Sequence, residues 1–243
     1  MSTATAHEPN LIVPLQGGKH HFLLRRLHSL TGLVFGGYLV VHLLVNATLI
    51  EGARHSGPTV FQIQVDKIHS LPFLLLVEFA LIYIPILYHT IYGIWITFTG
   101  QANVGNYPYS RNVFYTLQRI SAFIIFLFMV FHIFGMKGLF GSGLRFEPAT
   151  YATESAAYHF QQHWSIPWII YPIGVLASCY HLANGFWTAG ITWGLTVSAE
   201  AQKRWGYVCA GLFLLTFICG MLALIAIIRM EPVLSTPWII KAH

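Results

Sequence analysis

Five long apolar stretches constrain this chain more than any other feature of its sequence. They cover residues 24–50, 71–99, 112–138, 165–190 and 205–230. A helix of about 20 apolar residues crosses roughly 30 Å of hydrocarbon, so each stretch can span a bilayer. Only 9% of the residues are charged, against about 25% in soluble domains. The sequence therefore predicts an all-α membrane protein with five transmembrane helices and excludes a soluble globular enzyme.

The remaining residues form two tails and the loops. We expect residues 1–23 to be a retained inner tail, 24–230 the membrane domain and 231–243 an outer tail. The longest loop, 141–163, has room for a short surface helix, a point that the sequence does not decide. The net charge of +5 is spread thinly between the apolar stretches, which gives nucleic acid no continuous phosphate-binding face. We therefore expect membrane lipid, and no nucleic acid, around this chain.

The cationic residues indicate an orientation. With an inner N-terminus, seven cations lie inside and six outside, so the totals barely differ. The seven sit in short segments beside the span ends, where the positive-inside rule applies most strongly. They are Lys19, Arg25, Arg26, Arg111, Arg119, Lys203 and Arg204. We expect a cytoplasmic N-terminus and an external C-terminus.

Histidine is unusually common for so apolar a chain. Four of the 13 histidines lie well inside the first four apolar stretches, one in each: His42, His89, His132 and His181. A single histidine within a membrane most often makes a hydrogen bond between helices. The depths of these four favour a second interpretation.

The histidines of the first and third spans share one depth. His42 lies 16 residues past Arg26, and His132 lies 13 residues past Arg119. At 1.5 Å per residue, both are about 20–24 Å from the inner face. They are expected to form a layer toward the outside.

The histidines of the second and fourth spans share another depth, because these spans run in the opposite direction. His89 and His181 each lie 18 residues past the outer ends of their spans, near Leu71 and His163. That distance of about 27 Å brings both toward the inner face, roughly 15 Å from the other layer. The sequence thus predicts two pairs, His42 with His132 and His89 with His181.

Two histidine pairs at two depths call for two shared ligands. A b-type haem is a flat disc that accepts one imidazole on each face, and a helix bundle can hold it edge-on. Zinc usually takes three or four ligands, often with a thiolate or polar companion, and the surroundings of these histidines offer none. The pattern therefore favours two haem b groups.

Glycines accompany two of the four histidines. Tyr88-His89-x-x-x-Gly93-x-Trp95 recurs 92 residues later as Tyr180-His181-x-x-x-Gly185-x-Trp187. A glycine four residues after each histidine lies on the same helix face, where a missing side chain leaves room for a macrocycle. Gly135 could act in the same way beside His132. Close helix packing is the alternative role of such glycines.

Glu78 is the one carboxylate in the middle of a span. It precedes His89 by 11 residues, about three turns of a regular α-helix, which would place both side chains on one face. Its depth matches the His42–His132 layer. Two roles stay open: proton delivery to a substrate near the outer haem, and an interhelical hydrogen bond.

Cationic side chains near the inner ends of the spans are candidates for the haem propionates, which are anions. His28 is expected on the ligand face in the inner layer, 14 residues before His42. Arg26 and Arg119 are the other candidates. Anchoring by the positive-inside rule is the alternative role, and it is the better explanation for Arg25 and Arg111.

Several short runs resemble one known family. They are RRLHS at 25–29, SLPF at 70–73, LYHTIYG at 87–93, LQRIS at 117–121, HLANGFW at 181–187 and ITWG at 191–194. Together with the four histidines, they resemble the five-helix, two-haem cytochrome b subunit of succinate:menaquinone oxidoreductases and quinol:fumarate reductases. The resemblance extends from about residue 20 to 230.

The resemblance implies a role in electron transfer at a bacterial cytoplasmic membrane. It makes His89 and His181 the ligands of a proximal haem, and His42 and His132 those of a distal haem. Flavoprotein and iron–sulfur subunits would bind the cytoplasmic face, and menaquinone would react toward the outer side. Succinate would not contact this chain. In some relatives, polar residues near the outer end of span two help form a quinone pocket, and the candidates here are Gln62, Asp66 and His69.

Two other functions are compatible with intramembrane histidines. The cytochrome subunit of another membrane dehydrogenase, such as a hydrogenase or formate dehydrogenase, is also ligated by histidine pairs, but we do not expect one ligand in each of four successive spans there. A transporter that uses the histidines and Glu78 as a proton or metal relay would need broken helices and more polar groups along a path.

Overall fold

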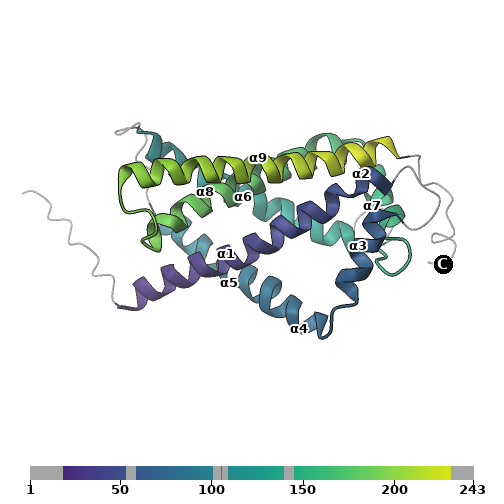
Figure 1. Cartoon of the computed structure of the whole chain (residues 1–243), viewed down its shortest axis with the longest axis horizontal. Helices are drawn as coiled ribbons and strands as arrows, with labels where there is room; N and C mark the ends of the chain where they lie inside the picture. The colour runs from purple at the N-terminus through teal and green to yellow at the C-terminus, as the bar shows by residue number, and fades with distance from the viewer. Residues whose placement is uncertain (1–18, 53–58, 101–104, 106–108, 140–144, 231–243) are drawn as a thin grey trace, which may run out of the picture.

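The computed structural model describes residues 19–52, 59–100, 105, 109–139 and 145–230, and these residues are helical with connecting turns, without a strand. Five helical segments are long and apolar enough to cross a membrane, which confirms the predicted fold class. They are His20–Ala47, Leu74–Thr99, Ser110–Met136, Ile166–Thr192 and Ala199–Arg229. Figure 1 shows them side by side along the long axis of the molecule. The chain is a multi-pass membrane protein.

The spans correspond to helices α1 (Lys19–Ala47), α6 (Ser110–Met136) and α9 (Ala199–Arg229) and to two composite helices. The second span consists of α4 (Leu74–Glu78), the π-helix η1 (Phe79–Tyr83) and α5 (Ile84–Thr99). The fourth consists of the π-helix η2 (Ile166–Ile170) and α8 (Tyr171–Thr192). Three short helices lie outside the spans: α2 (Leu49–Gly52), α3 (Val60–His69) and α7 (Ala152–Gln161).

The helices extend beyond the apolar stretches that predict them. The fifth span begins at Ala199, six residues before the predicted start at 205, because the Ser198 side chain accepts a hydrogen bond from the Ala201 backbone N–H. Such N-caps satisfy the unpaired amides of a first helical turn, so a polar turn can be helical. The first span likewise begins at Lys19, within the predicted tail 1–23. Residues 1–18 and 231–243 of the predicted tails lie outside the described residues.

Both π-helices are explained by proline. Pro85 and Pro172 each follow a π-helix by two residues, and the residues four positions earlier are Leu81 and Trp168. A proline has no N–H to donate to the carbonyl four residues back, and its ring collides with that carbonyl in an α-helix. The wider π turn avoids this collision within the membrane span. The hydropathy pattern contains no signal for it.

Helix α8 is central to the packing of the spans. It packs against α9, α6 and α1, while α5 packs against α1. The main contacts therefore run from α5 through α1 to α8 and α6, with α9 against α1 and α8. This order matters for the histidines, which lie on α1, α5, α6 and α8.

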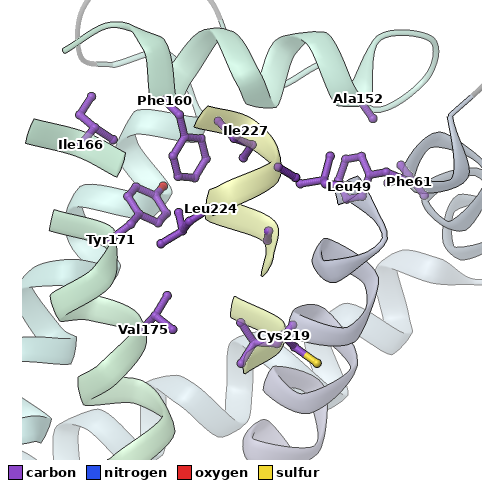
Figure 2. Close-up of a cluster of buried hydrophobic side chains, with 14 of the residues drawn as sticks. Leu49, Phe61, Ala152, Phe160, Ile166, Tyr171, Val175, Cys219, Leu224 and Ile227 are labelled. Carbon is purple, nitrogen blue, oxygen red and sulfur yellow. The ribbon is translucent and has the colours of Figure 1, made fainter. Parts of the chain in front are cut away.

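A hydrophobic core closes the end of the bundle where α1 and α9 finish, which we call the α7 end. Figure 2 shows side chains of α2, α3, α7, α8 and α9 meeting there, among them Leu49, Phe61, Phe160, Tyr171 and Ile227. Helix α7 belongs to this core, since seven of its ten residues are buried. The helix in the long loop is thus present and buried, whereas a surface helix was the expected alternative; residues 140–144 of that loop are outside the described part.

Gln62 of α3 attaches α7 to the rest of the α7 end. Its Nε2 donates to Asp66 Oδ1 and to the Pro148 carbonyl, both at 2.8 Å, and its Oε1 accepts from the Ala152 backbone N–H at 2.7 Å. Gln62 is buried. Its amide therefore uses both donor hydrogens and its oxygen within this network.

Replacing Gln62 with leucine should destabilise the α7 end. The Gln62→Leu variant keeps the volume but leaves the buried Ala152 N–H unpaired, at a cost of about 1–3 kcal/mol in the free energy of unfolding. The expected result is a lower thermal unfolding midpoint of the purified protein in detergent. Gln64→Leu, on the same helix and outside this network, is the control. Equal midpoints for the two variants would contradict a structural role for Gln62.

Candidate histidine pairs

The structure brings the four intramembrane histidines together as two pairs. The ring centroids of His42 and His132 are 6.0 Å apart, with an angle of 78° between the rings. Those of His89 and His181 are 6.1 Å apart, at 87°. These are the pairs that the depth argument groups, and their members come from α1 with α6 and from α5 with α8.

The separation within each pair fits two imidazoles on opposite sides of one metal ion. If each ring nitrogen binds at about 2.0–2.1 Å, as in metal–imidazole bonds, the two ring centroids lie roughly 6 Å apart. No group of three or more His, Cys, Asp or Glu side chains arranged for a metal occurs among the described residues. The geometry is therefore that of a two-ligand site, which suits a metal whose remaining positions come from a macrocycle.

Each pair is held by helices that are not principal packing partners. Among the four helices that carry the histidines, the strong packings are α1 with α5 and α6 with α8, whereas the paired rings lie on α5 and α8, and on α1 and α6. The imidazoles thus reach across the middle of the bundle toward one another. A flat ligand inserted edge-on in a helix bundle needs this arrangement.

Hydrogen bonds fix the tautomers of His89 and His181. His89 Nδ1 lies 3.0 Å from the His28 carbonyl oxygen, and His181 Nδ1 lies 3.2 Å from the Gln118 carbonyl oxygen. A carbonyl only accepts, so Nδ1 must carry the proton in both rings. Nε2 of each ring is then a free lone pair. This is the usual state of a metal-binding histidine, whose other nitrogen donates to a fixed acceptor.

Three polar residues surround His181 and were not predicted as site residues. Ser121 Oγ lies 3.2 Å from His181 Nδ1, Gln118 Nε2 donates to the His181 carbonyl at 3.1 Å, and Asn184 Nδ2 donates to Gln118 Oε1 at 2.8 Å. Their signal in the sequence is the pair of motifs LQRIS and HLANGFW, which contain all three. The network explains why these motifs occur together, since one supports the histidine of the other.

His132 has a different partner. Its Nδ1 lies 2.8 Å from the hydroxyl of Tyr171, the first residue of α8. His42 lies beside the ring of Tyr38, with centroids 5.6 Å apart. The His89–His181 pair is therefore held by backbone carbonyls, whereas the His42–His132 pair has a phenol beside it.

Comparison with known proteins places this arrangement in a family. No family model matches the chain. The chain is 32% identical over 215 residues to the succinate dehydrogenase cytochrome b558 subunit of Bacillus subtilis strain 168, covering 87% of this chain and 99% of that protein. This chain belongs to the succinate dehydrogenase cytochrome b558 subunit family. The family inferred from the short motifs is confirmed.

One other predicted residue of this cytochrome b558 family member, His28, lies at the His89–His181 pair. His28 stacks on His89, with ring centroids 4.0 Å apart, and Tyr92 lies 5.6 Å from His28. Among the described residues, five buried side-chain atoms have no hydrogen-bond partner. They are His28 Nδ1, Tyr92 Oη, Arg119 Nε, Tyr180 Oη and Thr196 Oγ1.

The two predicted propionate-binding arginines differ in their surroundings. Arg119 donates from Nη2 to the Gly100 carbonyl at 2.8 Å and lies 5.2 Å above the Tyr115 ring, while its buried Nε is unpartnered. Arg26 packs its guanidinium against the rings of Phe22 and Trp193, at 4.9 Å from each centroid. Arg119 is thus the arginine with a free buried donor.

The glycines beside the histidines make room for side chains. A Cβ on Gly93 would lie 3.2 Å from His28 Cε1, and one on Gly185 would lie 3.5 Å from Gln118 Nε2. The closest approach to the His89–His181 pair is at Gly32 of α1, where a Cβ would lie 2.6 Å from His89 Cε1. Gly135 similarly accommodates the ring of His159. Sequence analysis did not identify Gly32, because it lies on a different helix from His89.

The structure differs from the expected helix face of Glu78 relative to His89. Residues 79–83 form the π-helix η1, so the 11 residues from Glu78 to His89 do not make three regular α-turns. The expectation that both side chains share one face is therefore wrong. Glu78 lies within electrostatic range of Tyr38, whose ring centroid is 5.6 Å from that of His42. Its predicted depth near the His42–His132 pair agrees with this position.

The three predicted quinone residues of α3 lie at the α7 end. Asp66 and His69 are exposed, whereas Gln62 is buried in its network with α7. Their roles stay predictions.

Proposed function

We propose that this chain is the di-haem membrane anchor of a succinate:menaquinone oxidoreductase. The observation that carries the proposal is the presence of two histidine pairs, each with ring centroids about 6 Å apart, on four different spans. His89 and His181 would bind the proximal haem b, and His42 and His132 the distal one. Membership of the cytochrome b558 family supports haem b as the bound group.

The residues around the His89–His181 pair fit a haem. Their Nδ1 atoms are bonded to carbonyls, which leaves Nε2 of both rings to bind iron. The unpartnered buried donors of Tyr92, whose ring lies beside His28, and of Arg119 can serve an anionic group with acceptor oxygens. We propose that Arg119, with Arg26 and His28, binds the propionates, while Gly93 and Gly185 keep the helices close enough to the macrocycle. Each haem, when bound, supplies a one-electron carrier at its layer.

The proposed orientation places the His89–His181 pair toward the cytoplasm. The short cation-bearing segments at this end of the spans support it by the positive-inside rule. We propose that the flavoprotein and iron–sulfur subunits bind this face, so that electrons enter here. Menaquinone would then react at the α7 end, in a bacterial cytoplasmic membrane.

We propose that Glu78 delivers protons to menaquinone. The carboxyl group belongs to the second span and lies within electrostatic range of Tyr38, whose ring centroid is 5.6 Å from that of His42, which supports a position on the side of the distal pair. It can hold a proton at the level where quinone reduction consumes one. Asp66 and His69, exposed on the preceding helix, are proposed to connect this site with solvent, and Gln62 holds that helix in place.

Single alanine substitutions of the four histidines test the proposal. His42→Ala and His132→Ala should each remove the distal haem, and His89→Ala and His181→Ala the proximal one, because a haem held by one imidazole is bound far more weakly. Pyridine haemochrome analysis of the purified complex should fall from two haems per chain to one. Full haem content in all four variants would refute the ligand assignment.

Gly32→Ala tests the geometry of the proximal pair without removing a ligand. The added Cβ would lie 2.6 Å from Cε1 and 2.8 Å from Nδ1 of His89, which must move the ring and break its bond to the His28 carbonyl. The expected result is a changed spectrum or loss of the proximal haem only. Gly37→Ala on the same helix is the matched control, since a Cβ there meets nothing within 4 Å. Identical spectra of the two variants would contradict the proposed packing.

Glu78→Gln tests proton delivery. The amide keeps the size of the side chain but carries no transferable acid proton, so menaquinone turnover should fall by about 10²-fold, the lower range for acid–base groups. Both haem spectra should stay unchanged. Glu200→Gln, at the start of α9, is the control. Normal turnover with Glu78→Gln would leave Glu78 with a structural role.

A further inference from the structure

The hydrogen bonds of His132 continue beyond the membrane spans. Tyr171 Oη lies 2.8 Å from His132 Nδ1 and 3.2 Å from Nε2 of His159, a residue of α7. A single phenol thus joins an imidazole of the third span to an imidazole of the loop between the third and fourth spans. Neither Tyr171 nor His159 was predicted as a site residue.

We propose that Tyr171 and His159 are positioning residues for the distal haem ligand His132. The inference rests on the proposed function, in which His132 binds iron through Nε2. Nδ1–H of His132 then donates to Tyr171 Oη, and the Tyr171 hydroxyl hydrogen donates to Nε2 of His159. In this series of hydrogen bonds, the N–H of His132 and the O–H of Tyr171 each have one acceptor.

The surroundings hold this chain of hydrogen bonds in one arrangement. Tyr171 is 5% exposed, and its ring contacts Phe128 at 5.1 Å and Phe160 at 4.1 Å between centroids. Figure 2 shows Tyr171 and Phe160 facing one another within the core of the α7 end. These ring contacts keep the Tyr171 ring within the core, while the hydrogen bonds to His132 and His159 set the position of its hydroxyl.

Local backbone features also fit the arrangement. Tyr171 directly follows η2, and its N–H donates to the Ile166 carbonyl in the five-residue π pattern. Gly135, one turn after His132 on α6, leaves the space that the His159 ring fills. A side chain at position 135 would displace His159. The π turn before Tyr171 and the small side of α6 at Gly135 thus both favour the contact among His132, Tyr171 and His159.

His159 is suited to accept the last hydrogen bond. It is buried in α7, and burial lowers the pKa of its imidazole below the ordinary value. A neutral imidazole has one nitrogen free to accept. Helix α7 is in turn held by Gln62 and by the contact between Thr59 and Thr153.

The consequence for His132 is a stronger electron donor. A histidine whose Nδ1–H donates to a fixed acceptor binds a metal as a more basic ligand, which favours the oxidised metal. Removing that acceptor should therefore raise the midpoint potential of the distal haem. The proximal haem, whose ligands are held by backbone carbonyls, should be unaffected.

The test is redox potentiometry of the purified complex carrying Tyr171→Phe. We expect two haems per chain and a distal haem whose reduction equilibrium shifts about tenfold toward the reduced form, which is about 59 mV for one electron. The distal low-spin EPR signal should shift as well. Phe160→Leu is the control, because it loosens the packing of Tyr171 and leaves its hydrogen bonds in place.

Two further variants separate hydrogen bonding from packing. His159→Gln can still accept from Tyr171 through Oε1 and should keep the distal potential close to that of the native protein, whereas His159→Leu should raise it. Two haems with an unmoved distal potential in both Tyr171→Phe and His159→Leu would overturn the inference and leave the proposed function intact. So would an equal shift in Phe160→Leu. Full haem content in His132→Ala would instead refute the proposed function.

Discussion

An imidazole N–H within a membrane needs a fixed acceptor, because water is not there to replace one. For His89 and His181 that acceptor is a backbone carbonyl of a neighbouring helix, of His28 and of Gln118 respectively. The bond sets the tautomer, orients the ring and directs the second nitrogen toward the opposite histidine. The pairing of the His89 and His181 rings, and the roles proposed for them, depend on this constraint.

The two pairs differ in how this constraint is met. The carbonyls of His28 and Gln118 belong to the helical backbone of the spans, and the side chains beside the His89–His181 pair, such as Ser121 and the His28 ring, also come from the spans. His132 depends on a side chain, Tyr171, and through it on α7. The proposed tuning of the His42–His132 pair thus involves a helix outside the spans, while the His89–His181 pair is held by residues of the spans themselves.

The sequence predicts the spans and the histidine pairs well for a simple reason. Both follow from lengths: an apolar stretch must cover the hydrocarbon, and a constant rise per residue converts sequence distance into depth. The direction in which a side chain points around its helix axis is predicted less well. Glu78 and His89 were expected on one face, and the π-helix at 79–83 changes that rotation. Contacts between residues far apart in the chain, such as Gly32 with His89 or Tyr171 with His159, leave no periodic trace in the sequence at all.

The π-helices have a further consequence for the second and fourth spans. A π turn contains one residue more than the α turn it replaces, so it acts as a one-residue insertion that the helix has absorbed without interruption. The parts of a span on its two sides are offset by about 100°, the angle of one helical residue. In the second span, α5, which carries His89, can therefore keep its packing against α1 while α4 presents a different face. A one-residue insertion or deletion at the π turn would rotate all of α4 relative to α5. The two ends of this transmembrane helix can therefore change in sequence independently of one another.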